Sequence, residues 1–229
     1  MKLFIRIPTN ESVHFSLVPW LAWAARTYPN ADISTLNTAG YGIAWGRNRM
    51  RDDFLTSDCT HLWMIDADTI PPTNRHLTET ARDHTVVCGP YNGFNADIGV
   101  TWNVYNFKSD DSGVPMYGIY GPAMWPSLDK PFKVDAAGLG CSIIERQTLL
   151  ALHEEPFYHP INADGTYMGE DFNFCRDVGG VTIEPRCVCE HMRTVPLLVA
   201  RNQLEHYLHH ELEYRSKSNG KTITEEESV

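Results

Sequence analysis

The chain has 229 residues, of which 42% are hydrophobic, and a formal net charge of −10. This length and apolar content support a single sizeable α/β domain. The negative charge argues against the global attraction to polyphosphate that most nucleic-acid binders show. No apolar run is long enough to cross a membrane, and residues 1–15 lack the apolar centre of a signal peptide. The six cysteines lie inside apolar stretches, which is typical of reduced, buried thiols, so we expect a cytoplasmic protein.

The first part of the chain alternates between short apolar runs and amphipathic stretches. We expect strands at Leu3–Ile7, Asp32–Leu36, His61–Ile65 and Thr85–Cys88. We expect the intervening helices at residues 11–27 (with Asn10 as the N-cap), 43–55 and 74–82. This rhythm predicts a mostly parallel central sheet with helices on both faces, in which ligands bind at the carboxyl ends of the strands.

Two carboxylates follow directly after the strand that we expect at His61–Ile65. Asp66 and Asp68 flank Ala67, and in an extended chain they point to the same side. At a separation of about 5 Å and an effective dielectric constant of about 20, they repel each other by about 3 kcal/mol. A divalent cation would turn this cost into a binding site. Two aspartates that cap a turn or a helix are the alternative, and the motif alone does not decide between them.

The composition changes between Tyr91 and Phe132, where we expect an inserted hairpin. Residues 101–107 alternate like a half-buried strand, and residues 116–120 are expected to return as its partner. The insertion is dense in aromatic residues: Trp102, Tyr105, Phe107, Tyr117, Tyr120 and Trp125. We favour packing within the hairpin as their role, and a stacking platform for a sugar ring is the alternative.

A short helix is expected to begin at the segment Gly169-Glu170-Asp171. Steps of three and four from Asp171 reach Phe174, Cys175 and Val178, which places Asp171 on the apolar stripe. An ionised aspartate that faces the protein suits a general base. The alternative is an ordinary acid that compensates the helix dipole.

Three further segments complete the expected elements. Residues 132–144 read as a strand interrupted by Gly138 and Gly140, which in a strand often mark a close approach of a ligand or of another backbone, and a helix is expected at 145–152. Residues 181–191 read as the last strand, and Cys187, Cys189 and His191 share one face if it stays extended. We expect buried thiols here and not zinc, because no further ligand pair completes a tetrahedral site. A helix at 195–215 and a disordered polar tail at 216–229 would follow.

In their order and spacing, these motifs resemble those of GT-A-type glycosyltransferases of the large inverting, family-two-like group. The resemblance spans about residues 3–191 and rests on IPTNE (7–11), GRN (46–48), MIDAD (64–68), VDAAGLG (134–140), GED (169–171) and EH (190–191). It implies a Rossmann-like GT-A fold, with residues 1–215 as one catalytic domain. It also implies an inverting transfer of one hexosyl or pentosyl unit from a UDP- or GDP-linked nucleotide-sugar donor, with Mn²⁺ or Mg²⁺ as the metal ion. The acceptor would be a hydroxyl of a glycan, a protein, a lipid-linked sugar or a modified nucleic acid.

Carried over by position, the resemblance implies a site. The residues that contact the donor would be Thr9, Glu11, Arg47, Asn48, Asp66 and Ala67. Asp68 and His191 would hold the metal ion. Asp171 and Glu170 would be the catalytic residues, with Asp171 as the general base that deprotonates the acceptor.

Two alternatives to this function are considered. A nucleotidyltransferase usually needs a glycine-rich and basic loop after the first strand, and the sequence shows none. A non-catalytic module that binds nucleotide sugars would retain the pocket without the chemistry. The C-terminal motif of processive relatives and the membrane spans of polysaccharide synthases are not seen in the sequence, which favours a soluble enzyme that adds one sugar.

Overall fold

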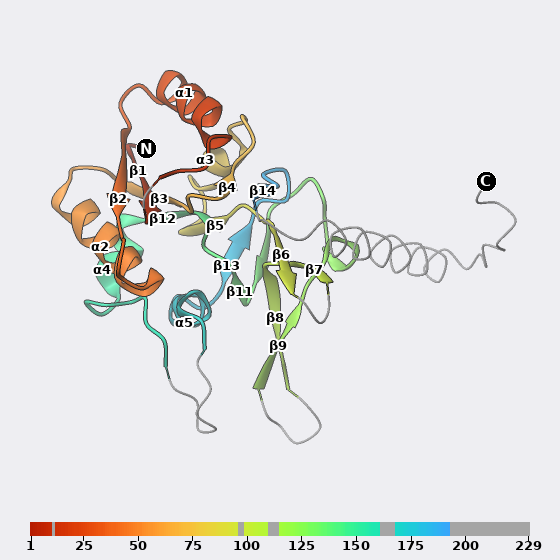
Figure 1. Cartoon of the computed structure of the whole chain (residues 1–229). Coiled ribbons are helices and arrows are strands. Elements are labelled where there is room, and N and C mark those ends of the chain that lie inside the picture. The colour runs from red at the N-terminus through yellow and green to blue at the C-terminus, as the bar shows by residue number, and fades with distance from the viewer. Residues whose placement is uncertain (11, 96–98, 110–114, 161–167, 193–229) are drawn as a thin grey trace, which may run out of the picture. The chain divides into compact units, whose positions relative to one another are not determined.

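The computed structural model describes residues 1–10, 12–95, 99–109, 115–160 and 168–192 (Figure 1). Residues 1–92 and 102–192 form one compact unit, and a second unit includes residues 93–95 and 99–101. Glu11, the helix expected at 195–215 and the tail expected at 216–229 lie outside the described residues. No helix within the described ranges is long and apolar enough to cross a membrane.

A seven-stranded sheet forms the centre of the first unit, in the order β10-β13-β5-β12-β3-β1-β2. Its strands are β1 (Leu3–Thr9), β2 (Asp32–Asn37), β3 (His61–Ile65), β5 (Val86–Cys88), β10 (Phe132–Val134), β12 (Cys141–Glu145) and β13 (Val181–Ile183). Five of the seven strands point in one direction, whereas β10 and β12 run antiparallel to their neighbours. The predicted mostly parallel α/β sheet is confirmed.

Helices cover both faces of this sheet, because successive side chains of its strands point to opposite faces. Phe4 of β1 belongs to one buried cluster and Ile5 to the other. The helices that contribute side chains to the Phe4 cluster are α2 (Ile43–Thr56), α4 (Arg146–Ala151) and α5 (Glu170–Asp177). The helices of the Ile5 cluster are α1 (Leu17–Thr27) and α3 (His76–Thr80). Figure 1 shows α1 and α3 on one side of the sheet and α2 and α4 on the other.

The first helix begins later than expected. We predicted a start at residue 11 with Asn10 as the N-cap, but α1 begins at Leu17, with Ser16 at the N-cap position. Pro19 therefore lies in the first turn, where its missing N–H group removes no intrahelical hydrogen bond. Asn10 instead accepts a hydrogen bond from the Thr38 hydroxyl, at 3.3 Å. The segment between β1 and α1 is thus left to line a pocket.

The aromatic insertion forms a hairpin, as predicted, but its first strand is interrupted. The chain breaks at Asn103 into β7 (Gly99–Trp102) and β8 (Val104–Ser109). Strand β8 pairs with β9 (Pro115–Ile119) and with β11 (Ala136–Ala137), and β7 pairs with β6 (Asn92–Asn95). Ring contacts such as Trp102–Trp125 (centroids 5.4 Å apart) and Tyr105–Phe172 (4.7 Å) support the packing interpretation. The short 3-10 helix η1 (Pro122–Met124) follows the hairpin.

The strand expected at residues 181–191 is also interrupted. Strand β13 ends at Ile183, and the Glu184 carboxylate then accepts a hydrogen bond from the Arg186 backbone N–H at 3.0 Å, which turns the chain. Cys189 then forms an isolated bridge with Tyr91, and β14 (Glu190–His191) pairs with β4 (Thr69–Ile70). The continuous strand expected at residues 181–191 is therefore wrong, although burial still alternates after the turn, with Cys187 and Cys189 buried and Val188 and Glu190 exposed.

Candidate active site

A pocket of about 500 Å³ opens at the carboxyl ends of β1 and β3. Its lining residues are Pro8, Asn10, Ser12, Thr38, Ile43, Asp66, Ala67 and Asp68. Its volume lies in the range of small-molecule sites, about 300 to 1,000 Å³. Parallel strands that end together leave such a crevice at their carboxyl edge. The carboxylate pair predicted from the sequence therefore lies in a pocket of suitable size for a nucleotide.

Asp68 and His191 lie beside each other at this pocket, although they are far apart in the sequence. The antiparallel pair β14–β4 places His191 opposite Thr69, and the His191 Nε2 atom lies 3.3 Å from Asp68 Oδ2. The Nδ1 atom of His191 lies 2.6 Å from the Asn92 carbonyl oxygen, which only accepts hydrogen bonds, so Nδ1 is the protonated nitrogen. Nε2 is therefore the ring nitrogen that faces Asp68, and it is the atom with which His191 would ligate a metal ion beside this carboxylate.

The donor atoms at this position fit a divalent cation that is shared with a substrate. Asp66 Oδ1 is buried and has no hydrogen-bond partner among the described residues. Asp66, Asp68 and His191 do not bring three ligand atoms within 4.8 Å of one another in the described part of the chain. Mg²⁺ is commonly held by one or two carboxylates together with substrate phosphates. The arrangement therefore suits an ion held by Asp68 and His191, with substrate oxygens in the remaining positions.

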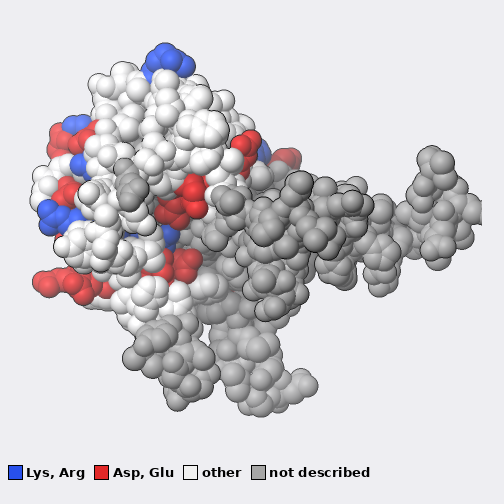
Figure 2. Space-filling model, in the orientation of Figure 1, with Lys and Arg blue, Asp and Glu red and all other residues white. Residues whose placement is uncertain are grey.

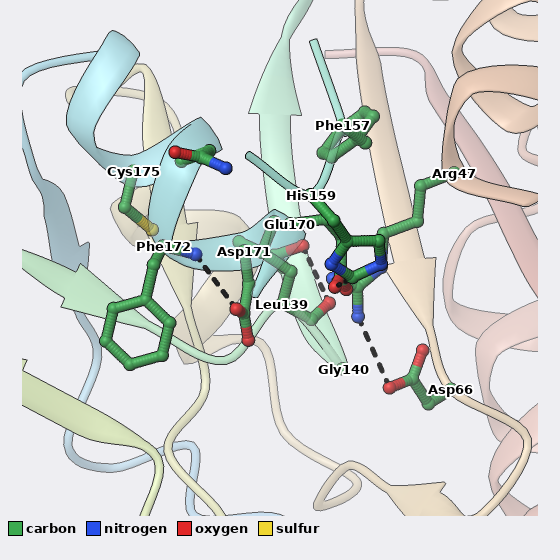
Figure 3. A network of polar contacts seen from close by, with 12 residues as sticks. Arg47, Asp66, Leu139, Gly140, Phe157, His159, Glu170, Asp171, Phe172 and Cys175 are labelled. Carbon is green, nitrogen blue, oxygen red and sulfur yellow. Dashed lines mark hydrogen bonds and ion pairs between the residues drawn. The ribbon is translucent and has the colours of Figure 1, made fainter. Parts of the chain in front are cut away.

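One buried arginine connects the pocket to helix α5. Arg47 of α2 is 3% exposed, and its Nη1 atom donates to Glu170 Oε1 at 2.7 Å (Figure 3). Its Nη2 atom lies 3.5 Å from Asp66 Oδ2. The His159 Nε2 atom lies 3.7 Å from the second carboxylate oxygen of Glu170, Oε2. Arg47 was expected to line the nucleotide pocket, and the structure places it behind the acids as their counter-ion.

The carboxylates around Arg47 outnumber its single positive charge. Burial disfavours the charged guanidinium, but Asp66, Glu170 and Asp171 together more than offset this and raise the pKa of Arg47. For Asp66, burial raises the pKa of the carboxyl, Arg47 opposes the rise, and Asp68 and Glu170 add to it. Three carboxylates that surround one cation leave a local negative charge. Such a site attracts a divalent cation.

Asp171 lies in the first turn of α5, beside Glu170. Its Oδ1 atom accepts a hydrogen bond from the Phe172 backbone N–H at 2.8 Å (Figure 3). Burial raises the pKa of Asp171, Arg47 lowers it, and the neighbouring Glu170 raises it further. Glu170, which pairs with Arg47, is more deeply buried than Asp171, so the apolar stripe identified only one of the two acids that face the protein. A carboxylate with a raised pKa is a stronger base than an ordinary aspartate.

Glycines make room for both functional carboxylates. A methyl group at Gly140 would lie 2.8 Å from Asp66 Oδ2 and 2.8 Å from the Tyr91 hydroxyl oxygen. A methyl group at Gly169 would lie 2.6 Å from Asp171 Oδ1. The sequence predicted that a ligand or another backbone lies close to the glycines of residues 138–140. The groups that lie close to Gly140 are instead the side chains of Asp66 and Tyr91.

The remaining predicted residues have different environments. The Thr9 carbonyl oxygen accepts hydrogen bonds from the Thr38 backbone N–H at 2.7 Å and from its hydroxyl at 3.1 Å. Asn48 forms two hydrogen bonds with the Phe157 backbone, at 2.8 and 3.1 Å. It also lines a second pocket, of about 440 Å³, with residues that include Trp45. Asn48 thus anchors the segment that follows α4.

Sequence reasoning missed several residues of the site. Tyr91 accepts a hydrogen bond from the Gly140 backbone N–H at 3.2 Å, and its ring meets the His191 ring edge-on, with centroids 5.1 Å apart. Ser12 and Thr38 line the pocket. The only sequence signal for them was their position just after β1 and β2, at the edge where ligands bind.

Charged side chains are distributed unevenly on the face drawn in Figure 2. On the face drawn in Figure 2, Asp and Glu side chains gather near the middle, and the Lys and Arg side chains are scattered. This face of the described residues therefore lacks the continuous basic track that a nucleic-acid backbone requires.

Comparisons with known proteins support the fold and leave the family open. No protein-family model and no curated protein sequence matches the chain. The structure is similar to that of A197 from STIV, with a TM-score of 0.57 and 20% identity over 85% of this chain and 87% of that chain. It is also similar to that of GalNAc-T7 with UDP, GalNAc and Mn²⁺, with a TM-score of 0.56 and 13% identity. That match covers 85% of this chain and 44% of GalNAc-T7. The predicted GT-A-like fold is confirmed.

Proposed function

We propose that the chain is a metal-dependent glycosyltransferase, which transfers one sugar from a nucleotide-sugar donor to an acceptor hydroxyl. The observation that supports this most strongly is the meeting of Asp68 and His191, 3.3 Å apart, at the rim of a pocket of about 500 Å³. The similarity in fold to GalNAc-T7, which was crystallised with UDP, GalNAc and Mn²⁺, agrees with this proposal in kind.

On the donor side, each acid has its own role. Asp68 and His191 would hold Mn²⁺ or Mg²⁺, which when bound would supply positive charge for the leaving nucleoside diphosphate. Asp66 lies in the same pocket and accepts hydrogen bonds from donor hydroxyls through its unpaired Oδ1 atom. Ala67 lines this pocket between the two acids, and the Thr9 carbonyl oxygen holds Thr38, another lining residue. The donor contact expected of Glu11 stays a prediction.

Arg47 acts through these acids and not on the donor. Its guanidinium is buried and contacts Asp66 and Glu170 at 3.5 and 2.7 Å. It therefore fixes the position of Asp66 at the pocket and that of the first turn of α5. Glu170, which holds the other end of this ion pair, positions its neighbour Asp171.

On the acceptor side, Asp171 is the general base. It takes the proton of the acceptor hydroxyl while that oxygen forms a bond to the anomeric carbon of the sugar. The bond from the anomeric carbon to the donor phosphate breaks in the same step, so the configuration inverts. The raised pKa of Asp171, which burial causes, increases its basicity.

The products of a reaction separate this proposal from its alternatives. The full chain is incubated with UDP- and GDP-linked sugars and Mn²⁺, and the released nucleotides are analysed by chromatography. Release of a nucleoside diphosphate, by transfer or by slow hydrolysis, supports a glycosyltransferase. Formation of pyrophosphate from nucleoside triphosphates and sugar phosphates would instead support a nucleotidyltransferase. Binding of a donor without any product would support a non-catalytic module.

A further inference from the structure

Three cysteines far apart in the sequence meet in the core behind the pocket. Cys141 is the first residue of β12, and Cys187 and Cys189 belong to the segment between β13 and β14. All three are buried, and their sulfur atoms lie within 4.8 Å of one another. In the described part of the chain, this is the only group of three or more His, Cys, Asp or Glu side chains that approach so closely.

This spacing matches that of sulfur ligands around one metal ion. A thiolate sulfur lies about 2.3 Å from a bound Zn²⁺, and three sulfurs at that length around one centre are about 4 Å apart. The Cys189 sulfur also lies 3.4 Å from the Cys187 carbonyl oxygen, and both side chains are buried on the same side of the segment, whereas Val188 between them is exposed. The cluster therefore needs no large rearrangement to surround an ion.

The backbone leaves room for this cluster at one glycine. A methyl group at Gly89 would lie 2.8 Å from the Cys187 carbonyl oxygen and 3.0 and 3.2 Å from the sulfurs of Cys189 and Cys187. The other three cysteines are also buried but do not belong to any such group. Packing of single thiols in the core accounts for those three, whereas it does not explain why three sulfurs gather at one point.

We propose that Cys141, Cys187 and Cys189 bind a single thiophilic metal ion, with Cu(I) as the best fit. Structural Zn²⁺ almost always takes four protein ligands, and the group found within the described residues has three. Soft sulfur ligands favour Cu(I). The cation also offsets the charge of thiolates, which burial without a counter-charge disfavours.

An ion at this position would brace the donor pocket from behind. Cys141 follows Gly140, whose carbonyl oxygen accepts a hydrogen bond from the Asp66 backbone N–H at 2.8 Å. Cys189 precedes His191 by two residues. The ion would therefore join the segment that presents His191 to β12, the strand that pairs with β3 just before Asp66. The inference does not depend on the proposed transferase activity, because metal binding itself is measured.

The test is a titration of the reduced full chain with Cu(I) in the presence of a chromophoric competitor, under anaerobic conditions. We expect the wild type to bind one equivalent tightly. Cys141→Ala and Cys187→Ala should each weaken this binding by more than about 100-fold. A loss of this size exceeds the loss that substitutions outside the ligand shell cause. Cys59→Ala removes a buried thiol outside the group and should bind like the wild type. Equal affinity in the wild type and Cys141→Ala, or an equal loss in Cys59→Ala, would overturn the proposal.

A second measurement covers the case in which the cysteine variants do not fold. X-ray absorption spectroscopy at the copper edge of the loaded wild type counts the atoms bound to the ion. Three sulfur neighbours are the expected result. Fewer sulfurs, or a shell of nitrogen and oxygen, would place the ion elsewhere and refute the assignment.

Discussion

The Arg47 guanidinium donates to the Glu170 carboxylate at 2.7 Å, and both side chains are almost completely buried. These residues are 123 positions apart in the sequence. Their pair connects helix α2 to the first turn of α5, and the same guanidinium contacts Asp66 at the end of β3. One cation thus holds together a donor-binding acid and the helix that bears the proposed base.

Removal of this cation should destabilise the protein strongly. Arg47→Ala leaves Glu170 buried without a counter-charge, which typically costs about 3 to 5 kcal/mol. The matched control is Arg49→Ala on the same helix, where the exposed pair with Asp53 contributes at most about 0.5 kcal/mol. Urea unfolding followed by circular dichroism measures both. Similar losses in the two variants would show that the Arg47–Glu170 pair has no special role.

Substitution of the proposed base should abolish turnover and leave the fold intact. Asp171→Asn keeps the oxygen that accepts the Phe172 backbone N–H. It removes a carboxylate whose pKa is raised by burial, so the free energy of unfolding at neutral pH should stay equal or increase. We expect kcat to fall by about 10² to 10⁴, with donor binding unchanged. Wild-type turnover in Asp171→Asn would refute the base assignment.

The pH dependence of the wild type should reflect the same residue. Burial, opposed by Arg47 and assisted by Glu170, raises the pKa of Asp171 above its ordinary value of 3.8. Because the base acts only when deprotonated, kcat/KM should fall as the pH decreases through this raised pKa. The acidic limb should therefore lie above pH 3.8. The stability of the fold changes in the opposite direction. The raised pKa of Asp171 stabilises the folded protein at pH values below the ordinary pKa, and this stabilisation is lost as the pH rises through the raised pKa. A limb at or below the ordinary value would contradict the environment described for Asp171.

A single methyl group should test the position of Asp66. Gly140→Ala brings a carbon within 2.8 Å of Asp66 Oδ2 and of the Tyr91 hydroxyl oxygen, and such overpacking costs about 1 to 3 kcal/mol. We expect donor affinity to fall by about tenfold or more, as measured by calorimetry. Gly121→Ala is the control, since its methyl group meets only Trp102 at an ordinary 3.7 Å. Unchanged donor binding in Gly140→Ala would exclude Asp66 as a donor contact.

Local patterns in the sequence were sufficient to predict the sheet and the pocket acids. The run of four apolar residues from Leu62 to Ile65 predicted β3, and the structure buries its side chains alternately in the two clusters, with the acids after it at the expected edge. The predicted start of α1 was wrong. Asn10 is a favourable N-cap residue, but its side chain accepts a hydrogen bond from Thr38 instead, and the helix begins only at Leu17. Local sequence patterns do not reveal a contact between two residues that lie this far apart in the chain.

The same limit explains what was missed around Cys141. The interruption after Ile183 depends on the hydrogen bond between Glu184 and Arg186, which a strand pattern does not reveal. Once the chain turns there, Cys187 and Cys189 reach a strand that lies far earlier in the sequence. The composition showed that the thiols are buried, but their meeting is a property of the fold.

The central claim is that Asp68 and His191 together bind the metal–diphosphate part of the donor. Calorimetric titration of the wild type with UDP and GDP, with and without Mn²⁺, tests it most directly. We expect Mn²⁺ to tighten the binding of one nucleotide by at least about tenfold. Asp68→Asn and His191→Gln should lose this gain, and Asp83→Asn, at an exposed acid outside the pocket, should keep it. Binding that is independent of Mn²⁺ in the wild type, or a gain that survives in Asp68→Asn and His191→Gln, would contradict the account.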